Sequence, residues 1–245
     1  MSNDEIKTFL RSRTTEEFLA AVSGLKRSPY TFNDGTVIHR DGTDALDDPR
    51  KYNQVPVIIG TTSEESKVFM YLFGLHERWG SALYQRFAKT STRVTRAAGT
   101  DTLAQRMRAH GSQPGVYSYV FIYGQYRPFG YNAWPTDSGP TDKMSWAVAI
   151  GAAHAVDIPF NFGIMESFSL FGLEEYLFRE DNRQGWQALS DAMISYTAQF
   201  ARSGNPNTEG LPEWTEWPES KGAPKFILFD ANDQEARIEM SAVVP

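Results

Sequence analysis

The sequence predicts an α/β fold, in which helices cover a sheet of buried strands. Three short runs are apolar or β-branched at nearly every position, as buried strands are: residues 55–60, 116–123 and 225–230. Between these runs, apolar residues recur three or four positions apart, which is typical of amphipathic helices. Strands that alternate with helices in this way build a sheet with helices packed on it. We therefore expect an α/β sheet with flanking helices.

The composition supports a large hydrophobic core and excludes several classes of function. The 245 residues are 41% hydrophobic and 13% aromatic, which is ample material for one domain. The formal net charge is −6 and the basic residues form no stripe, so we expect no nucleic-acid partner. No apolar run approaches the roughly 18 residues of a transmembrane helix, so we expect no membrane span. The absence of cysteine excludes disulfides, cysteine nucleophiles and thiolate metal sites.

The chain opens with two predicted short helices. Ser2 or Asn3 can cap a helix over residues 4–10. The sequence Thr-Thr-Glu-Glu at residues 14–17 is a capping box that leads into an apolar run at residues 18–22. Because such caps satisfy the backbone N–H groups that a first helical turn leaves free, we expect both helices to form.

Loops and longer helices follow in order along the chain. Residues 23–54 are rich in Gly, Pro, Asn and Asp and predict a long loop, with one short extended piece at residues 36–39. Two amphipathic stretches are predicted within residues 76–110. The clearest helix spans residues 185–203, where apolar residues recur with helical spacing and Gly204 is placed to end it. No linker divides the chain into independent domains.

The first predicted strand indicates that the sheet is incomplete. Residues 55–60 are apolar at nearly every position, which is typical of a strand with neighbours on both sides and helices on both faces. Three strands make a small sheet with exposed edges. We therefore expect that part of this sheet lies outside the chain.

Two adjacent carboxylates follow this strand, which stops at Gly60. In one interpretation, residues 62–65 (Thr-Ser-Glu-Glu) are a capping box in which Glu65 ties down the first turn of a helix. In the other, Glu65 is a functional acid at the carboxyl end of a strand, where open α/β sheets bind ligands. Glu64 competes for that role. Adjacent side chains on a helix point about 100° apart, so only one of them can face a site.

A histidine stands out in a second segment, residues 151–163. One interpretation is that His154 is half-buried and satisfied by a backbone carbonyl; the other is that it is a general base. Small residues leave room around its ring, and an apolar run that includes Ile158 and Phe162 is expected to shield it from water. The other three histidines are expected at the surface, and no pair has metal-ligand spacing, so we expect no metal site and no cofactor.

The chain shows no nucleophile. It contains no G-x-S-x-G elbow, no Gly-Gly pair resembling an oxyanion loop and no glycine-rich phosphate loop. Ser63 lies near Glu65 but lacks the glycines of a strained elbow, so we do not expect it to be a nucleophile. Several nearby aromatic residues are expected to be packing residues, of which those nearest the candidate acid and base could line a pocket: Phe69, Phe73, Trp146, Phe160 and Phe162.

At these two segments the chain resembles the type-B carboxylesterase and cholinesterase family of α/β-hydrolases. The family's strand followed by G-x-x-x-[D/E]-E is similar to residues 55–65, and this resemblance places Glu65 at the triad carboxylate. The family's G-x-x-H-x-x-[D/E]-[I/L]-x-[F/Y]-x-F-G pattern is similar to residues 151–163. It places His154 at the triad base and Asp157 at a supporting acid. Further similarity extends over nearly the whole chain.

The resemblance covers only the C-terminal half of the family. It implies that residues 1–245 are the C-terminal part of one carboxylesterase-like α/β-hydrolase domain, which lacks the N-terminal strands and the nucleophile elbow. One departure is Ser66, where the family usually has glycine after the acid.

The resemblance also implies an activity, the hydrolysis of small-molecule carboxylic esters through an acyl-enzyme. The chain would supply Glu65 and His154, while an N-terminal half-domain would be the partner that carries the nucleophilic serine and the oxyanion hole. We expect the chain alone to be inactive. The alternatives are a non-catalytic, cholinesterase-like binding module and an inactive truncated fragment. Retention of both residues counts against the binding module.

Overall fold

The structure is a computed structural model that describes residues 1–23, 33–220 and 222–244. It separates into two compact units, Met1–Gly42 and Thr43–Pro245, which are described in turn. Residues 24–32 of the predicted long loop lie outside the described residues. The expectation that both units belong to one domain stays a prediction.

The first unit contains the two predicted helices, α1 (Asn3–Arg11) and α2 (Thr15–Ser23). Ser2, not Asn3, caps α1: its hydroxyl accepts from the backbone N–H of Glu5, and the Glu5 carboxylate accepts from the N–H of Ser2. Thr14 and Glu17 form the same reciprocal pair at the start of α2. Both capping predictions are therefore confirmed.

The short extended piece predicted at residues 36–39 is wrong. The Asp34 carboxylate accepts hydrogen bonds from the backbone N–H groups of Thr36, Val37 and Ile38. An aspartate side chain that captures the following N–H groups bends the backbone and competes with strand formation. Residues 36–39 accordingly contain no strand.

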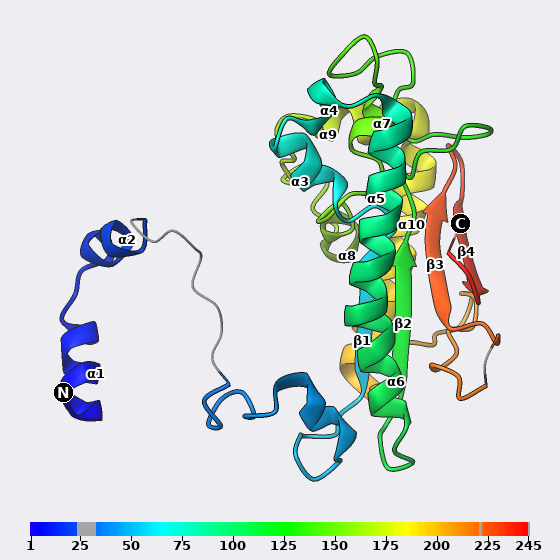
Figure 1. Ribbon diagram of the computed structural model, residues 1–245. Helices are drawn as coiled ribbons and strands as arrows, with labels where there is room; N and C mark the ends of the chain where they lie inside the picture. Colours follow the sequence, from blue (N-terminus) through cyan, green and yellow to red (C-terminus); the bar gives the residue numbers. More distant parts are fainter. Residues whose placement is uncertain (24–32, 221, 245) are drawn as a thin grey trace. The chain divides into compact units, whose positions relative to one another are not determined.

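The second unit contains a four-stranded sheet among its described residues. The strands β1 (Val57–Thr62), β2 (Val116–Phe121), β3 (Phe226–Ala231) and β4 (Ala236–Ser241) lie in the order β1-β2-β3-β4 (Figure 1). The first three are parallel and β4 is antiparallel to β3. The three predicted strands are confirmed. Sequence analysis missed β4, although apolar Ile238 and Met240 alternate with charged Arg237 and Glu239 in the two-residue period of a half-exposed strand.

β1 forms one edge of this sheet. It pairs with β2 on one side and with no described strand on the other. Residues 57–60 are only half-buried, whereas β2 is buried at nearly every position. The strand therefore has the apolar sequence that is typical of a central strand, although it lies at the edge of the described sheet. The backbone N–H and C=O groups on its outer side pair with no described strand.

Helices pack on both faces of the sheet, as predicted. The helix predicted at residues 185–203 is α10 (Arg183–Ser203), which ends at Gly204 in the left-handed conformation and contacts β3 and β4. The amphipathic stretches of residues 76–110 form α5 and α6, and α6 contacts β2. The bounds of these two helices and of the remaining described helical elements are η1 (Gly42–Asp47), α3 (Lys67–Leu72), α4 (Leu75–Arg78), α5 (Ser81–Arg96), η2 (Ala97–Asp101), α6 (Thr102–Arg108), α7 (Trp146–Ala149), α8 (Ile158–Phe162), α9 (Glu174–Leu177) and η3 (Glu180–Asn182).

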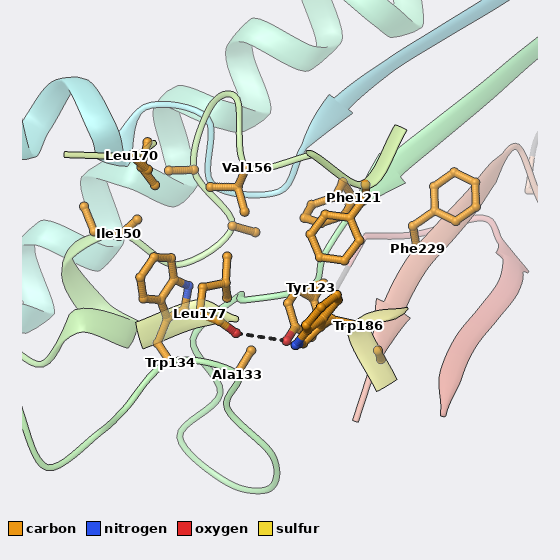
Figure 2. Packing of buried hydrophobic residues seen from close by; sticks show 14 of the residues in the cluster. Phe121, Tyr123, Ala133, Trp134, Ile150, Val156, Leu170, Leu177, Trp186 and Phe229 are labelled. Carbon is orange, nitrogen blue, oxygen red and sulfur yellow. Dashed lines mark hydrogen bonds between the residues drawn. The ribbon is translucent and has the colours of Figure 1, made fainter. Parts of the chain in front are cut away.

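Alternate side chains of β2 enter two separate cores. Val116 and Val120 pack with the α6 side, whereas Tyr117 and Phe121 pack on the opposite side, with residues of α10. This alternation follows from the two-residue period of a strand. The larger core extends from Phe229 and Trp186 past Phe121 to Trp134, and Tyr123 donates its hydroxyl to the Leu177 carbonyl within it (Figure 2). None of the described helices is long and apolar enough to span a membrane.

Candidate active site

Glu65 lies in the turn between β1 and α3, where its two carboxylate oxygens have different partners. Oε1 accepts from the backbone N–H of Thr62 at 2.8 Å and from the Thr61 hydroxyl at 2.9 Å. The Thr62 hydroxyl makes no reciprocal hydrogen bond, so the predicted capping box is only half formed. The backbone contacts immobilise the carboxylate through Oε1, and Oε2 remains available to another group.

That other group is the ring of His154. Nδ1 of His154 lies 2.7 Å from Oε2 of Glu65, although the two residues are 89 positions apart in sequence. The segments also meet through their backbones, since the His154 N–H donates to the Glu65 carbonyl at 3.4 Å. The ring of His154 is therefore hydrogen-bonded to a carboxylate and not to a backbone carbonyl. The structure brings together the two residues that the sequence singled out.

The partner of Nδ1 determines the chemistry of the ring. An ionised carboxylate only accepts hydrogen bonds, so Nδ1 carries the proton and Nε2 of the neutral ring is left as an acceptor. Nε2 has no hydrogen-bond partner within the described residues, and the His154 side chain is 56% exposed. The ring is therefore oriented by Glu65 and presents a free basic nitrogen.

A cavity of about 440 Å³ adjoins this pair. Phe69 lies beside it, with its ring centroid 5.4 Å from that of His154, and remains half-exposed. The expectation that Ile158 and Phe162 shield the histidine is wrong, because both are exposed. The short helix α8 buries Pro159 and Phe160, so Ile158 and Phe162 are turned outward. The cavity is lined by Gly60, Thr61, Glu65, Ser66, Phe69, Thr95, Arg96, Gly99, Thr100 and His154.

Asp157 lies close to the pair but faces a different group. Its Oδ2 accepts the hydroxyl proton of Tyr119 at 2.8 Å. Burial raises the pKa of Asp157, the Tyr119 hydrogen bond opposes that shift, and the charge of Glu65 adds to it. Burial, followed by the charge of Asp157, also raises the pKa of Tyr119. Asp157 is thus a half-buried carboxyl with a raised pKa, and it lies close enough to Glu65 to feel its charge.

Comparison with known proteins identifies the family. Residues 69–242, which include His154 and begin just after Glu65, match the carboxylesterase family. The chain belongs to the carboxylesterase family.

The chain is similar to carboxylesterases of mammals in sequence and to a bacterial carboxylesterase in fold. It is 24% identical to carboxylesterase 1C of Rattus norvegicus over 93% of its own length and 43% of that protein. It is 38% identical to liver carboxylesterase of Sus scrofa over 72 residues, 29% of this chain and 12% of the relative. Its fold is similar to that of the carboxylesterase EST55 of Geobacillus stearothermophilus, with a TM-score of 0.60, 22% identity, and coverage of 96% of this chain and 47% of that one. The chain therefore spans less than half the length of these relatives.

Glu64, the competing acid of this carboxylesterase-family chain, does not contact His154. Its side chain points into the protein and forms an ion pair with Lys67, with Oε1 2.6 Å from Nζ. Only one of the two adjacent glutamates thus faces His154, as the sequence predicted. Lys67 is fully buried and was missed by sequence analysis, although an acid and a base three positions apart are a recognisable pair.

The remaining histidines and serines do not extend the site. His76 was expected at the surface, but it is buried and stacks on Tyr71, with ring centroids 4.4 Å apart. The described residues contain no cluster of His, Cys, Asp and Glu that could hold a metal ion. Within the described ranges no serine hydroxyl bonds to His154. Of the two serines that flank the glutamates, Ser63 has a buried hydroxyl without a partner, and the Ser66 hydroxyl lies 2.6 Å from that of Ser91.

Proposed function

We propose that this chain supplies the acid and the base for hydrolysis of small-molecule carboxylic esters by a serine mechanism. The observation that carries the proposal is the 2.7 Å contact between Oε2 of Glu65 and Nδ1 of His154, which leaves Nε2 free beside a cavity. Membership of the carboxylesterase family supports the same reaction.

Each residue has a defined role in this mechanism. Nε2 of His154 takes the proton of a serine hydroxyl as that oxygen attacks the ester carbonyl, and it then donates the proton to the leaving alcohol. Glu65 keeps the proton of the ring on Nδ1 and stabilises the imidazolium that forms. In the second half of the cycle, His154 activates water against the acyl-enzyme in the same way.

The nucleophile in this proposal comes from an N-terminal half-domain that docks beside β1. Two features support such a partner. The outer edge of β1 has no strand neighbour among the described residues, although its sequence is that of a central strand. Val55, which precedes β1, and Leu72 and Phe73 at the C-terminal end of α3 are exposed apolar side chains, which a docking surface would bury.

The test is intact-mass spectrometry of the tagged chain, purified from the cells that produce it and treated with a serine-directed phosphonate. We expect a phosphonate adduct on a second, co-purifying polypeptide, together with hydrolysis of short p-nitrophenyl esters. An adduct on this chain would contradict the proposed origin of the serine. Absence of both adduct and hydrolysis would contradict the proposed activity and favour a binding module.

Variants test the two assigned residues separately. In the two-chain sample, Glu65→Gln should lower kcat by about 10⁴-fold, because it removes the carboxylate that orients the imidazole ring. His154→Gln should lower kcat by at least as much, because it removes the general base. His110→Gln is the matched control, since His110 hydrogen-bonds to the Leu46 carbonyl and should leave kcat unchanged. Full activity of His154→Gln would exclude this histidine as the base.

A further inference from the structure

The buried ion pair between Glu64 and Lys67 has no part in the chemistry proposed above, yet it contacts the segment that carries His154. The side chain of Lys67 is 0% exposed and that of Glu64 is 9% exposed, so both charges lie in the protein interior. Burial lowers the pKa of Lys67, and the charge of Glu64 opposes this shift. A buried pair of this kind is weak evidence for stability, because desolvation can exceed the attraction between the charges.

Glu64 is bonded in both directions to Ala152, two residues before His154. Its backbone N–H donates to the Ala152 carbonyl at 3.0 Å, and its Oε2 accepts from the Ala152 N–H at 3.0 Å. The same oxygen lies 3.4 Å from the backbone nitrogen of Tyr126, which donates to it. Glu64, which directly precedes the candidate acid Glu65, thus holds the backbone just before the candidate base His154.

Lys67 completes this contact from the other side. Its Nζ lies 2.6 Å from Oε1 of Glu64 and 3.5 Å from the Ala147 carbonyl. It therefore neutralises the carboxylate and reaches the start of the same loop. The two carboxylate oxygens are divided between the cation and the backbone N–H of residue 152, which orients Glu64 completely.

Gly151 shows how closely the loop approaches the pair. Its backbone has a φ of 55°, and a Cβ placed there would lie 1.8 Å from Oε2 of Glu64 and 2.9 Å from Nζ of Lys67. Only glycine leaves room for the pair at this position and adopts this conformation without strain. The loop and the ion pair therefore fit each other over a continuous stretch that ends at the histidine.

We propose that Glu64 and Lys67 are positioning residues, which hold the segment 147–154 so that Nδ1 of His154 stays within hydrogen-bond distance of Glu65. The functional meaning of this role rests on the proposed function, but the distance itself does not. Glu65 is bonded to residues 61 and 62 on its own strand. The position of His154 relative to it depends on what fixes the opposite segment, and Glu64 is one of the residues that do so, through its two hydrogen bonds to Ala152.

The test is proton NMR of the purified chain, which requires no ester hydrolysis. A proton shared between Nδ1 of His154 and a carboxylate gives a strongly deshielded signal, which His154→Gln assigns by its loss. We expect Lys67→Met to lose this signal, because it removes the cation that holds Oε1 of Glu64 and so frees that side chain to turn away from Ala152. Glu216→Gln is the control, since it breaks the 3.0 Å ion pair with Arg108, which involves none of the residues that contact the 147–154 segment, and should retain the signal.

A second variant distinguishes a loss of positioning from a loss of the folded state. Glu64→Leu/Lys67→Met removes both buried charges, and such replacements often preserve stability. It should fold by circular dichroism and still lack the deshielded proton, because nothing accepts from the N–H of residue 152. Retention of the signal in either folded variant overturns the positioning role. So does unfolding of both variants while the control folds, which would make the pair a stability element. A missing signal in the unmodified chain overturns it as well, and ester hydrolysis can fail without affecting any of these results.

Discussion

Gly60→Ala should strongly destabilise the second unit, because the ring of Tyr119 lies against Gly60. A Cβ built at Gly60 would approach three ring atoms of Tyr119 at 2.1, 2.2 and 2.3 Å, where real Cβ contacts are essentially never under 3.0 Å. The ring must therefore move by about 1 Å or more. It is held in place by the 2.8 Å hydrogen bond from its hydroxyl to Asp157 and by packing on Phe229.

The expected loss follows from two contributions. Overpacking a rigid site costs about 1–3 kcal/mol. Displacing Tyr119 also breaks a hydrogen bond to a half-buried carboxyl, which is worth about 1.5–3 kcal/mol if that group is ionised. Together these amount to about 2.5–6 kcal/mol out of a typical total of about 5–15 kcal/mol. With a urea m value of about 3 kcal/mol/M, the unfolding midpoint should fall by about 1–2 M.

Urea denaturation followed by tryptophan fluorescence measures this loss. Gly80→Ala is the matched control, because nothing lies within 4 Å of a Cβ there, and it should change the stability by less than about 0.5 kcal/mol. In a Tyr119→Ala background, Gly60→Ala should become nearly neutral, so that the coupling energy is about as large as the loss that Gly60→Ala causes in the unmodified chain. A loss below about 1 kcal/mol for Gly60→Ala in the unmodified chain would refute the packing of Tyr119 over Gly60.

Two further predictions concern α8 and its N-cap residue. Phe160→Ala should cost about 3–5 kcal/mol in urea unfolding, because its ring is 0% exposed, whereas Phe162→Ala, at a position 72% exposed, should stay within about 0.5 kcal/mol. Equal losses would contradict the assigned faces of this helix. Asp157→Asn tests how the stability depends on pH. Because the pKa of Asp157 is raised in the folded state, the folded state binds more protons than the unfolded state at pH values between the two pKa values. The contribution of Asp157 to the free energy of unfolding therefore falls as the pH rises through that window. In thermal unfolding, the stability of the variant relative to that of the unmodified chain should therefore increase from pH 4 to pH 7. A stability difference that is the same at both pH values would exclude the raised pKa.

Local patterns in the sequence account for most of the elements that surround the site. Buried strands and capping boxes are short-range signals, and they predicted β1, β2, β3 and both helices of the first unit. The same reasoning missed β4, whose few apolar residues alternate with charged ones and whose pairing with β3 is a tertiary property. It also misplaced His76, since burial of a histidine depends on the elements that fold over it.

The sequence by itself determined that Glu65 and His154 stand in segments of the type that carry an acid and a base, because a strand end and a small-residue loop are local features. Only the tertiary structure decided that these segments meet, with 2.7 Å between Oε2 and Nδ1. It also decided that Glu64 turns inward to Lys67, because burial of that pair depends on the loop at residues 147–152 closing over it. The physical reason is that hydrogen-bonded contacts across 89 residues arise from packing, which no local pattern contains.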